Sequence, residues 1–246
     1  MVKRQNIYQD IIKSVSTKEK LLAVLIDPDK FLIENTRSFI EKVNASIATH
    51  VFVGGSTVDD FATEVLVSEI KKNTSLPVVL FPGDITQITE KADAILFLSL
   101  LSGRNPDYLI GKHVEAVSKL DKTMLEVVST GYILIESGKQ TAVERVTKTK
   151  PLPRKEIQDI INTAKAGQLL GMKLIYLEAG SGAEKALSEK IIKSVKNELA
   201  IPLIVGGGIK SKAQLEQAYK AGADLVVIGT AFEDDDLFFE DLRLIN

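Results

Sequence analysis

The last third of the chain carries three apolar runs that each end in glycine. They are residues 174–182 (LIYLEAGSG), 202–209 (PLIVGGGI) and 225–230 (LVVIGT). Apolar runs rich in β-branched residues predict buried strands, and a glycine turn before a helix lets backbone N–H groups converge on an anion. A spacing of about two dozen residues is typical of consecutive βα units in a (β/α)8 barrel, whose last loops often bind phosphate. We therefore expect a barrel with a phosphorylated ligand.

The same alternation of apolar and amphipathic stretches runs through the whole chain, and no segment has the character of a domain linker. It predicts an α/β protein, a (β/α)8 TIM barrel, with one domain over residues 1–246. Only ten residues, 84–93, separate the third strand (78–81) from the fourth (94–98). They leave room for one helical turn, so the third helix should be reduced or missing. A long polar loop is expected at 136–153.

The main rival architecture is an open doubly wound sheet, but the chain lacks its usual Gly-x-Gly-x-x-Gly signature. Charge and composition exclude further classes of function. With 31 Lys and Arg against 33 Asp and Glu, the net charge of −2 gives no basic field for nucleic acid. There is no cysteine for a disulfide, a thiol nucleophile or a Cys-zinc site. Neither a signal-like start nor a membrane-length apolar run occurs, so we expect a cytoplasmic protein.

Two polar side chains end the first two predicted strands, which should be neighbours. Asp27 follows the first strand and Ser56 the second. A carboxylate and a hydroxyl suit a partial Mg²⁺ shell, because Mg²⁺ prefers hard oxygen ligands and keeps water and substrate oxygens in the remaining positions. The alternative is structural: Asp27 would cap an Asp-Pro turn, and Ser56 would cap the second helix.

Glu178 lies inside an apolar strand, two residues before a glycine turn. A carboxylate directed into the barrel mouth must find a partner or a task, and a general base for a substrate hydroxyl is such a task. A buried ion pair is the structural alternative. Tyr176 shares the strand face of Glu178 and either binds substrate phosphate or fills the barrel.

Six motifs together resemble the geranylgeranylglyceryl phosphate synthase family, including its bacterial PcrB-like members, and the resemblance covers nearly the whole chain. The segment 25–27 (LID) and the extended central loop make this chain similar to the second, longer group of that family. The motifs are residues 25–30 (LIDPDK), 54–56 (GGS), 130–137 (TGYILIES), 176–182 (YLEAGSG), 206–209 (GGGI) and 229–230 (GT).

The resemblance implies an enzyme that joins sn-glycerol 1-phosphate to a polyprenyl diphosphate, above all geranylgeranyl diphosphate, and releases pyrophosphate in ether lipid biosynthesis. It implies Mg²⁺ held by Asp27 and Ser56, and catalysis by Glu178 with Tyr176. A homo-oligomer and peripheral membrane contact through the lipid product are further expectations. The implied glycerol phosphate site comprises Tyr176, Leu177, Glu178, Ala179, Gly180, Ser181, Gly182, Gly207, Gly208, Gly229 and Thr230.

Two other functions stay open at this point. A sugar-phosphate isomerase or lyase could use the same phosphate site, although these enzymes commonly need a Lys, a His or a second acid at the barrel mouth. A non-catalytic phospho-ligand binder could keep the glycine turns without the chemistry. The joint presence of Asp27, Ser56 and Glu178 argues for an enzyme.

Overall fold

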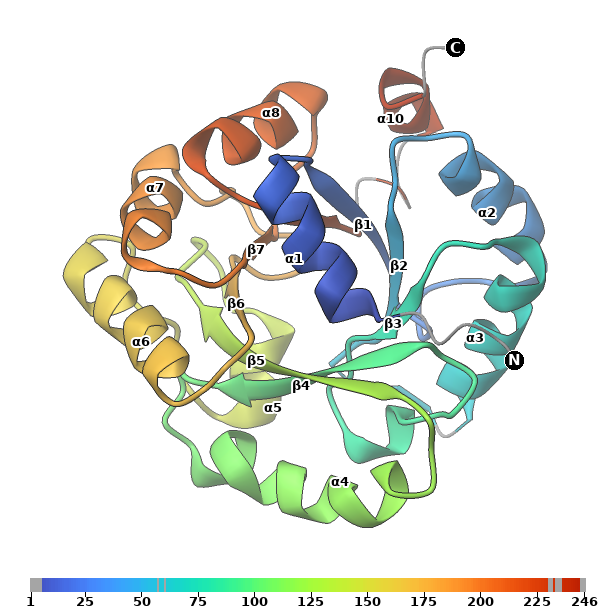
Figure 1. Cartoon of the computed structure of the whole chain (residues 1–246), viewed down its shortest axis with the longest axis horizontal. Coiled ribbons are helices and arrows are strands. Elements are labelled where there is room, and N and C mark those ends of the chain that lie inside the picture. The colour runs from blue at the N-terminus through green and yellow to red at the C-terminus, as the bar shows by residue number, and fades with distance from the viewer. Residues whose placement is uncertain (1–5, 57, 60, 230–231, 233–235, 244–246) are drawn as a thin grey trace.

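A closed barrel of eight parallel strands forms the centre of the protein (Figure 1). The computed structural model describes residues 6–56, 58–59, 61–229, 232 and 236–243. The strands follow one another around the barrel in chain order, and β8 pairs with β1 to close it. The expected (β/α)8 fold is confirmed. The strands are β1 (Leu21–Ile26), β2 (His50–Val53), β3 (Val78–Leu80), β4 (Ala94–Leu100), β5 (Glu126–Leu134), β6 (Leu174–Glu178), β7 (Leu203–Gly206) and β8 (Leu225–Ile228).

Helices surround the barrel, and their ends carry the capping residues that the sequence offers. In α8, for example, the Ser211 hydroxyl accepts the Gln214 N–H at 3.3 Å, and the helix stops at Gly222 in the left-handed conformation. The helices are α1 (Ile7–Thr17), α2 (Thr36–Asn44), α3 (Ala62–Asn73), α4 (Lys112–Leu120), α5 (Ala142–Thr147), α6 (Ile157–Leu169), α7 (Glu189–Glu198), α8 (Lys212–Ala221) and α10 (Asp236–Asp241), with short 3-10 turns η1 (Ile33–Asn35) and η2 (Ile85–Gln87) and a π-helical turn η3 (Asp107–Gly111).

Side-chain alternation divides the core into two layers. Along β6, Leu174 and Tyr176 point into the barrel interior, whereas Ile175 and Leu177 pack between the sheet and the helices. Both faces of each strand are therefore buried, which explains why the strands read as continuous apolar runs rather than as alternating ones. Glu178 shares the inward face of Tyr176.

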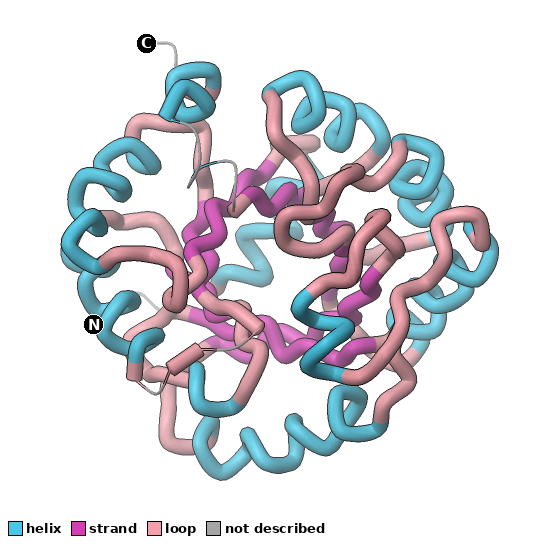
Figure 2. The backbone as a smooth tube through the Cα atoms, turned by 180° about the vertical axis from the view of Figure 1, so that it is seen from behind, coloured by secondary structure: helices cyan, strands magenta, loops and turns pink. Residues whose placement is uncertain are grey.

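Helix α1 covers the amino-terminal end of the barrel, where Ile7 and Ile11 join the interior core (Figure 1). The Glu126 carboxylate accepts the Ile7 N–H at 2.6 Å and the Tyr8 N–H at 3.1 Å, so it binds the positive end of the helix. One end of the barrel is thus closed. The opposite end, where loops follow the strands, is the one that can hold a ligand (Figure 2).

The third βα unit lacks a full helix, as expected. Only η2 lies between β3 and β4. Helix α4 is fastened to this turn by two lysines: Lys112 pairs with Asp84 at 3.0 Å, and the Lys119 ammonium donates to the Ile85 carbonyl at 3.1 Å. The side chains of η2 and α4 thus lie where a third helix would otherwise cover the barrel.

The prediction of a continuous loop at 136–153 is wrong, because it contains α5. A capping box starts this helix: the Thr141 hydroxyl accepts the Glu144 N–H, and the Glu144 carboxylate accepts the Thr141 N–H. Each bond satisfies a helix-end donor that a solvated loop would leave to water. Strand β5 precedes this segment and pairs without a break with β4 and β6.

Candidate functional site

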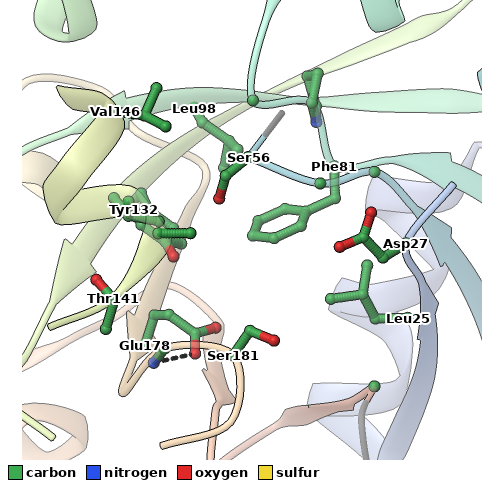
Figure 3. A pocket seen from close by; sticks show the side chains of 18 of the residues that line it. Leu25, Asp27, Ser56, Phe81, Leu98, Tyr132, Thr141, Val146, Glu178 and Ser181 are labelled. Carbon is green, nitrogen blue, oxygen red and sulfur yellow. Dashed lines mark hydrogen bonds between the residues drawn. The ribbon is translucent and has the colours of Figure 1, made fainter. Parts of the chain in front are cut away.

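A cavity of about 570 Å³ opens among the loops at the carboxyl ends of the strands (Figure 3). One of its walls carries Asp27, Ser56 and Phe81, and the facing wall carries Glu178 and Ser181. The cavity continues past β4 to the inner face of α4. The structure therefore brings the predicted metal residues and the predicted base into one space.

Glu178 is the buried carboxylate of this cavity, with only 6% of its surface exposed. Burial raises its pKa above the usual value, and the Gly180 N–H, which donates to Oε1 at 2.5 Å, partly offsets this effect. No Lys or Arg among the described residues pairs with it. The alternative of a buried ion pair is therefore wrong, and a desolvated carboxylate is suited to accept a proton.

Tyr176 lies directly below this carboxylate in the barrel interior. A Cβ added at Gly206 would be 2.4 Å from the Tyr176 hydroxyl and 2.7 Å from Glu178 Oε2. The Glu178 carboxylate interacts with the Tyr176 hydroxyl, although the pair does not meet the geometry of a regular hydrogen bond, and no other described residue bonds to this buried hydroxyl. Burial, together with the Glu178 carboxylate, holds the Tyr176 pKa well above its usual value, so the hydroxyl stays protonated and can donate to a ligand.

An aromatic cluster forms the floor of the cavity. The Phe81 ring stacks on Tyr176 with ring centroids 5.3 Å apart, and the Tyr132 ring meets Tyr176 edge-on at the same separation. These contacts fix the tyrosine beneath Glu178. Tyr176 thus fills the barrel and also presents a polar tip, so both roles considered for it are compatible.

Two glycine loops form the part of the cavity that lies beside Glu178. Gly180 and Gly182 after β6, and Gly207 and Gly208 after β7, all have positive φ. Larger residues are excluded by contacts as well as by φ, since a Cβ at Gly207 would lie 2.3 Å from Glu178 Oε1. Close backbone approach and exposed N–H groups are the features by which such loops bind phosphate.

The other predicted glycerol phosphate residues divide into two groups. Ser181 and Gly229 line the cavity. Leu177 and Ala179 have fully buried side chains in the outer core layer, so they offer only their backbone to a ligand. Thr230 lies outside the described residues.

Asp27 and Ser56 follow neighbouring strands, as expected. Asp27 Oδ1 accepts the Asp29 N–H at 3.2 Å, Oδ2 pairs with Lys30 at 2.8 Å, and a Cβ at Gly55 would be 2.4 Å from Oδ1. Asp27 therefore does cap its turn, while its carboxylate also borders the loop that carries Ser56. Ser56 does not cap α3, whose N-cap is Phe61.

The donor set tests whether these residues suit Mg²⁺. No group of three His, Cys, Asp or Glu side chains in the described part of the chain is arranged to hold a metal ion. Two hard oxygen donors beside an open cavity fit a Mg²⁺ that takes its other ligands from water and substrate. They do not fit a closed structural metal site.

Several residues that line the cavity lie outside the motifs that mark the site in the sequence. Lys139, Thr141 and Arg145 belong to the segment around α5, and the Thr-x-x-Glu capping signature at 141–144 was the signal that could have revealed it. His113 of α4 also lines the cavity, and its Nε2 lies 3.1 Å from the Ser99 hydroxyl.

The second histidine is remote from this chemistry. His50 starts β2 and is buried, and burial lowers its pKa to about 4. It makes a 2.8 Å contact between Nδ1 and the Thr49 hydroxyl, and its ring meets Phe52 edge-on. It is a neutral core residue.

Eight parallel strands, glycine loops after β6 and β7, and a buried carboxylate beside them define the class of phosphate-binding (β/α)8 barrel enzymes. The chain belongs to the PcrB family, whose model matches residues 14–244.

Several relatives carry the name geranylgeranylglyceryl phosphate synthase. The one from Zunongwangia profunda is 61% identical over 91% of this chain and 95% of its own length, and the one from Pyrococcus furiosus is 42% identical over 88% and 87%. A solved structure of (S)-3-O-geranylgeranylglyceryl phosphate synthase from Thermoplasma acidophilum, in complex with its substrate sn-glycerol-1-phosphate, is 33% identical. It superposes with a TM-score of 0.90 over 97% of this chain and 96% of that chain.

Proposed function

We propose that this protein is a prenyltransferase that joins sn-glycerol 1-phosphate to geranylgeranyl diphosphate and releases pyrophosphate. The observation that carries the proposal is the continuity of one cavity from the glycine loops, past Glu178, to the apolar side chains of β4 and α4. A small phosphorylated alcohol fits the first end and a long hydrocarbon chain the second. The family membership and the names of the relatives support the same reaction.

The glycine loops bind the phosphate and direct the glycerol toward Glu178. The carboxylate takes the proton of the C3 hydroxyl while that oxygen forms a bond to C1 of the prenyl chain. The bond between C1 and the diphosphate oxygen breaks, and the electron pair leaves with pyrophosphate. The raised pKa of Glu178 brings its basicity closer to the operating pH, which is what a general base requires.

Asp27 and Ser56 would hold Mg²⁺ at the opposite wall. Bound there, the ion would neutralise charge on the departing diphosphate. The separation between this wall and Glu178 keeps the leaving group away from the base (Figure 3). The paired Lys30 and Asp27 further imply that metal binding competes with an existing ion pair.

A single assay tests the proposal against its rivals. Purified protein is incubated with radiolabelled sn-glycerol 1-phosphate and a series of prenyl diphosphates, with Mg²⁺ or with a chelator. We expect a labelled organic-soluble product that requires both substrates and Mg²⁺. Product without Mg²⁺ would overturn the metal assignment alone, and absence of any prenyl transfer would overturn the function.

No helix in the described part of the chain is long and apolar enough to cross a membrane. We propose a cytoplasmic homo-oligomer that touches the membrane only when it delivers its lipid product. Ile110, Val114 and Val117 form an exposed apolar face on η3 and α4, and this face supports association.

A further inference from the structure

The basic side chains that line the cavity differ in how they are neutralised. They include Lys30, Lys112 and Lys139. Lys30 pairs with Asp27 at 2.8 Å, and Lys112 pairs with Asp84 at 3.0 Å. Lys139 has no carboxylate partner among the described residues. Its positive charge is thus available to a ligand.

Lys139 lies at the end of the cavity that the glycine loops after β6 and β7 form, here called the glycine-loop end. A Cβ added at Gly182 would be 3.2 Å from the Lys139 Nζ, so the ammonium lies directly against the glycine loop after β6. The same cavity is bordered by Gly180 and Gly207. An anion held by these loops would lie within reach of this ammonium.

The backbone of Lys139 is held in place from both sides. Before it, Gly138 has φ +96°, and a Cβ there would be 2.8 Å from Glu184 Oε2. After it, the Thr141 side chain packs so closely on Gly180 that a Cβ at Gly180 would be 2.4 Å from its methyl group. The loop that carries Lys139 therefore packs against the glycine loop on both sides of the lysine.

Arg154 fastens the same two loops together. Its guanidinium donates to the Glu136 carbonyl at 3.2 Å, to the Lys185 carbonyl at 3.1 Å and to the Ala186 carbonyl. Glu136 lies in the loop after β5, whereas the other two carbonyls lie beyond the glycine loop after β6. These hydrogen bonds hold the segment that carries Lys139 against the loop after β6.

We propose that Lys139 is a further substrate-binding residue whose ammonium contacts the phosphate of the bound glycerol phosphate. The identity of that phosphate ester rests on the proposed function. A phosphate monoester carries close to two negative charges, and backbone N–H groups supply only partial positive charges. One lysine supplies a full positive charge and a charge-assisted hydrogen bond.

This role predicts where the kinetic effect appears. The phosphate is remote from the bond that forms, so its contact with Lys139 is the same in the ground state and the transition state. Loss of such a contact raises the KM of that substrate and leaves kcat nearly unchanged. The KM for the prenyl diphosphate should not respond.

The test compares Lys139→Gln and Lys139→Arg with Lys150→Gln, a matched control. Lys150 is an exposed residue that follows α5 and does not line the cavity. Binding of sn-glycerol 1-phosphate and of inorganic phosphate is measured by calorimetry for each folded variant, and steady-state kinetics follow. We expect Lys139→Gln to weaken both ligands about tenfold, Lys139→Arg to stay within about threefold of the wild type, and Lys150→Gln to bind like the wild type.

The outcomes separate this proposal from the function on which it rests. If phosphate binding depends on Lys139 but no prenyl diphosphate is used, Lys139 keeps its role and the proposed reaction fails. If Lys139→Gln binds both ligands within about twofold of the wild type, the Lys139 proposal is wrong whether or not prenyl transfer occurs. Wild-type protein that binds neither ligand would also overturn it.

Discussion

The two ends of the cavity are built in different ways. At the glycine-loop end, the backbone shapes the cavity, because glycines after β6 and β7 adopt positive φ. The full helices α6, α7 and α8 support the strands behind these loops. At the other end, η2 replaces a helix, and side chains of β4 and α4 form the wall. Backbone geometry tolerates little change, whereas a side-chain wall can be altered one residue at a time. Substitutions at the first end should lower activity with every prenyl diphosphate. Substitutions at the second end should change activity to an extent that depends on the length of the prenyl chain.

The largest effect is expected at Glu178, between the two ends. Glu178→Gln keeps the shape and the acceptor for the Gly180 N–H but cannot take a proton. We expect kcat to fall about 100-fold or more, with unchanged affinity for sn-glycerol 1-phosphate, in single-turnover and calorimetric measurements. Glu136→Gln, in an exposed residue outside the cavity, is the control. A nearly wild-type rate for Glu178→Gln would remove Glu178 from the role of base.

Stability gives a second readout for the same variant. Burial raises the pKa of Glu178 in the folded protein above its value in the unfolded chain. Protonation of this carboxyl therefore stabilises the fold at low pH, and this contribution to the free energy of unfolding is lost as the pH rises through the raised pKa. The neutral amide avoids this loss. We therefore expect thermal unfolding of Glu178→Gln at pH 8 to occur no lower than that of the wild type, so that a lost rate cannot be explained by a lost fold.

A smaller and more selective effect is expected at Asp27. Asp27→Asn can still accept the Asp29 N–H, but it loses the charge that a divalent ion needs. With Mg²⁺ present, we expect prenyl diphosphate to bind about tenfold more weakly and sn-glycerol 1-phosphate to bind as before. Titration of each ligand separately measures this. Equal loss of both affinities would show that Asp27 only holds its turn, and the two ends would then not be independent.

The geometry of the glycine-loop end could be predicted from sequence because its signal is local. Glycines after apolar runs, and a lone Glu178 within one of them, are visible without any tertiary information. The missing third helix could also be predicted, because ten residues cannot hold a turn into and out of a full helix.

The apolar end could not be predicted in the same way. Which face of α4 points inward depends on how η2, Lys112 and Lys119 fasten the helix, and these contacts link residues about 30 positions apart. Leu109, His113 and Ala116 share one helical face by spacing, yet of these three only His113 and Ala116 line this cavity, and Leu109 borders a second one. The π-helical turn η3 shifts the register between them.

The smallest effect is expected at Ala116, where the side-chain wall can be tested directly. Ala116 is 4% exposed and lines the cavity beside Ile88 and Phe97. Trp at this position would occupy space that a long chain needs, so Ala116→Trp should lower activity with geranylgeranyl diphosphate about fivefold while sparing geranyl diphosphate. Ser118→Trp, on the exposed side of α4, controls for a bulky residue on this helix. Circular dichroism and kcat/KM for each chain length decide the matter. A folded Ala116→Trp that is equally active on both chains would place the hydrocarbon elsewhere, and the contrast between a backbone-built end and a side-chain-built end would no longer describe substrate selection.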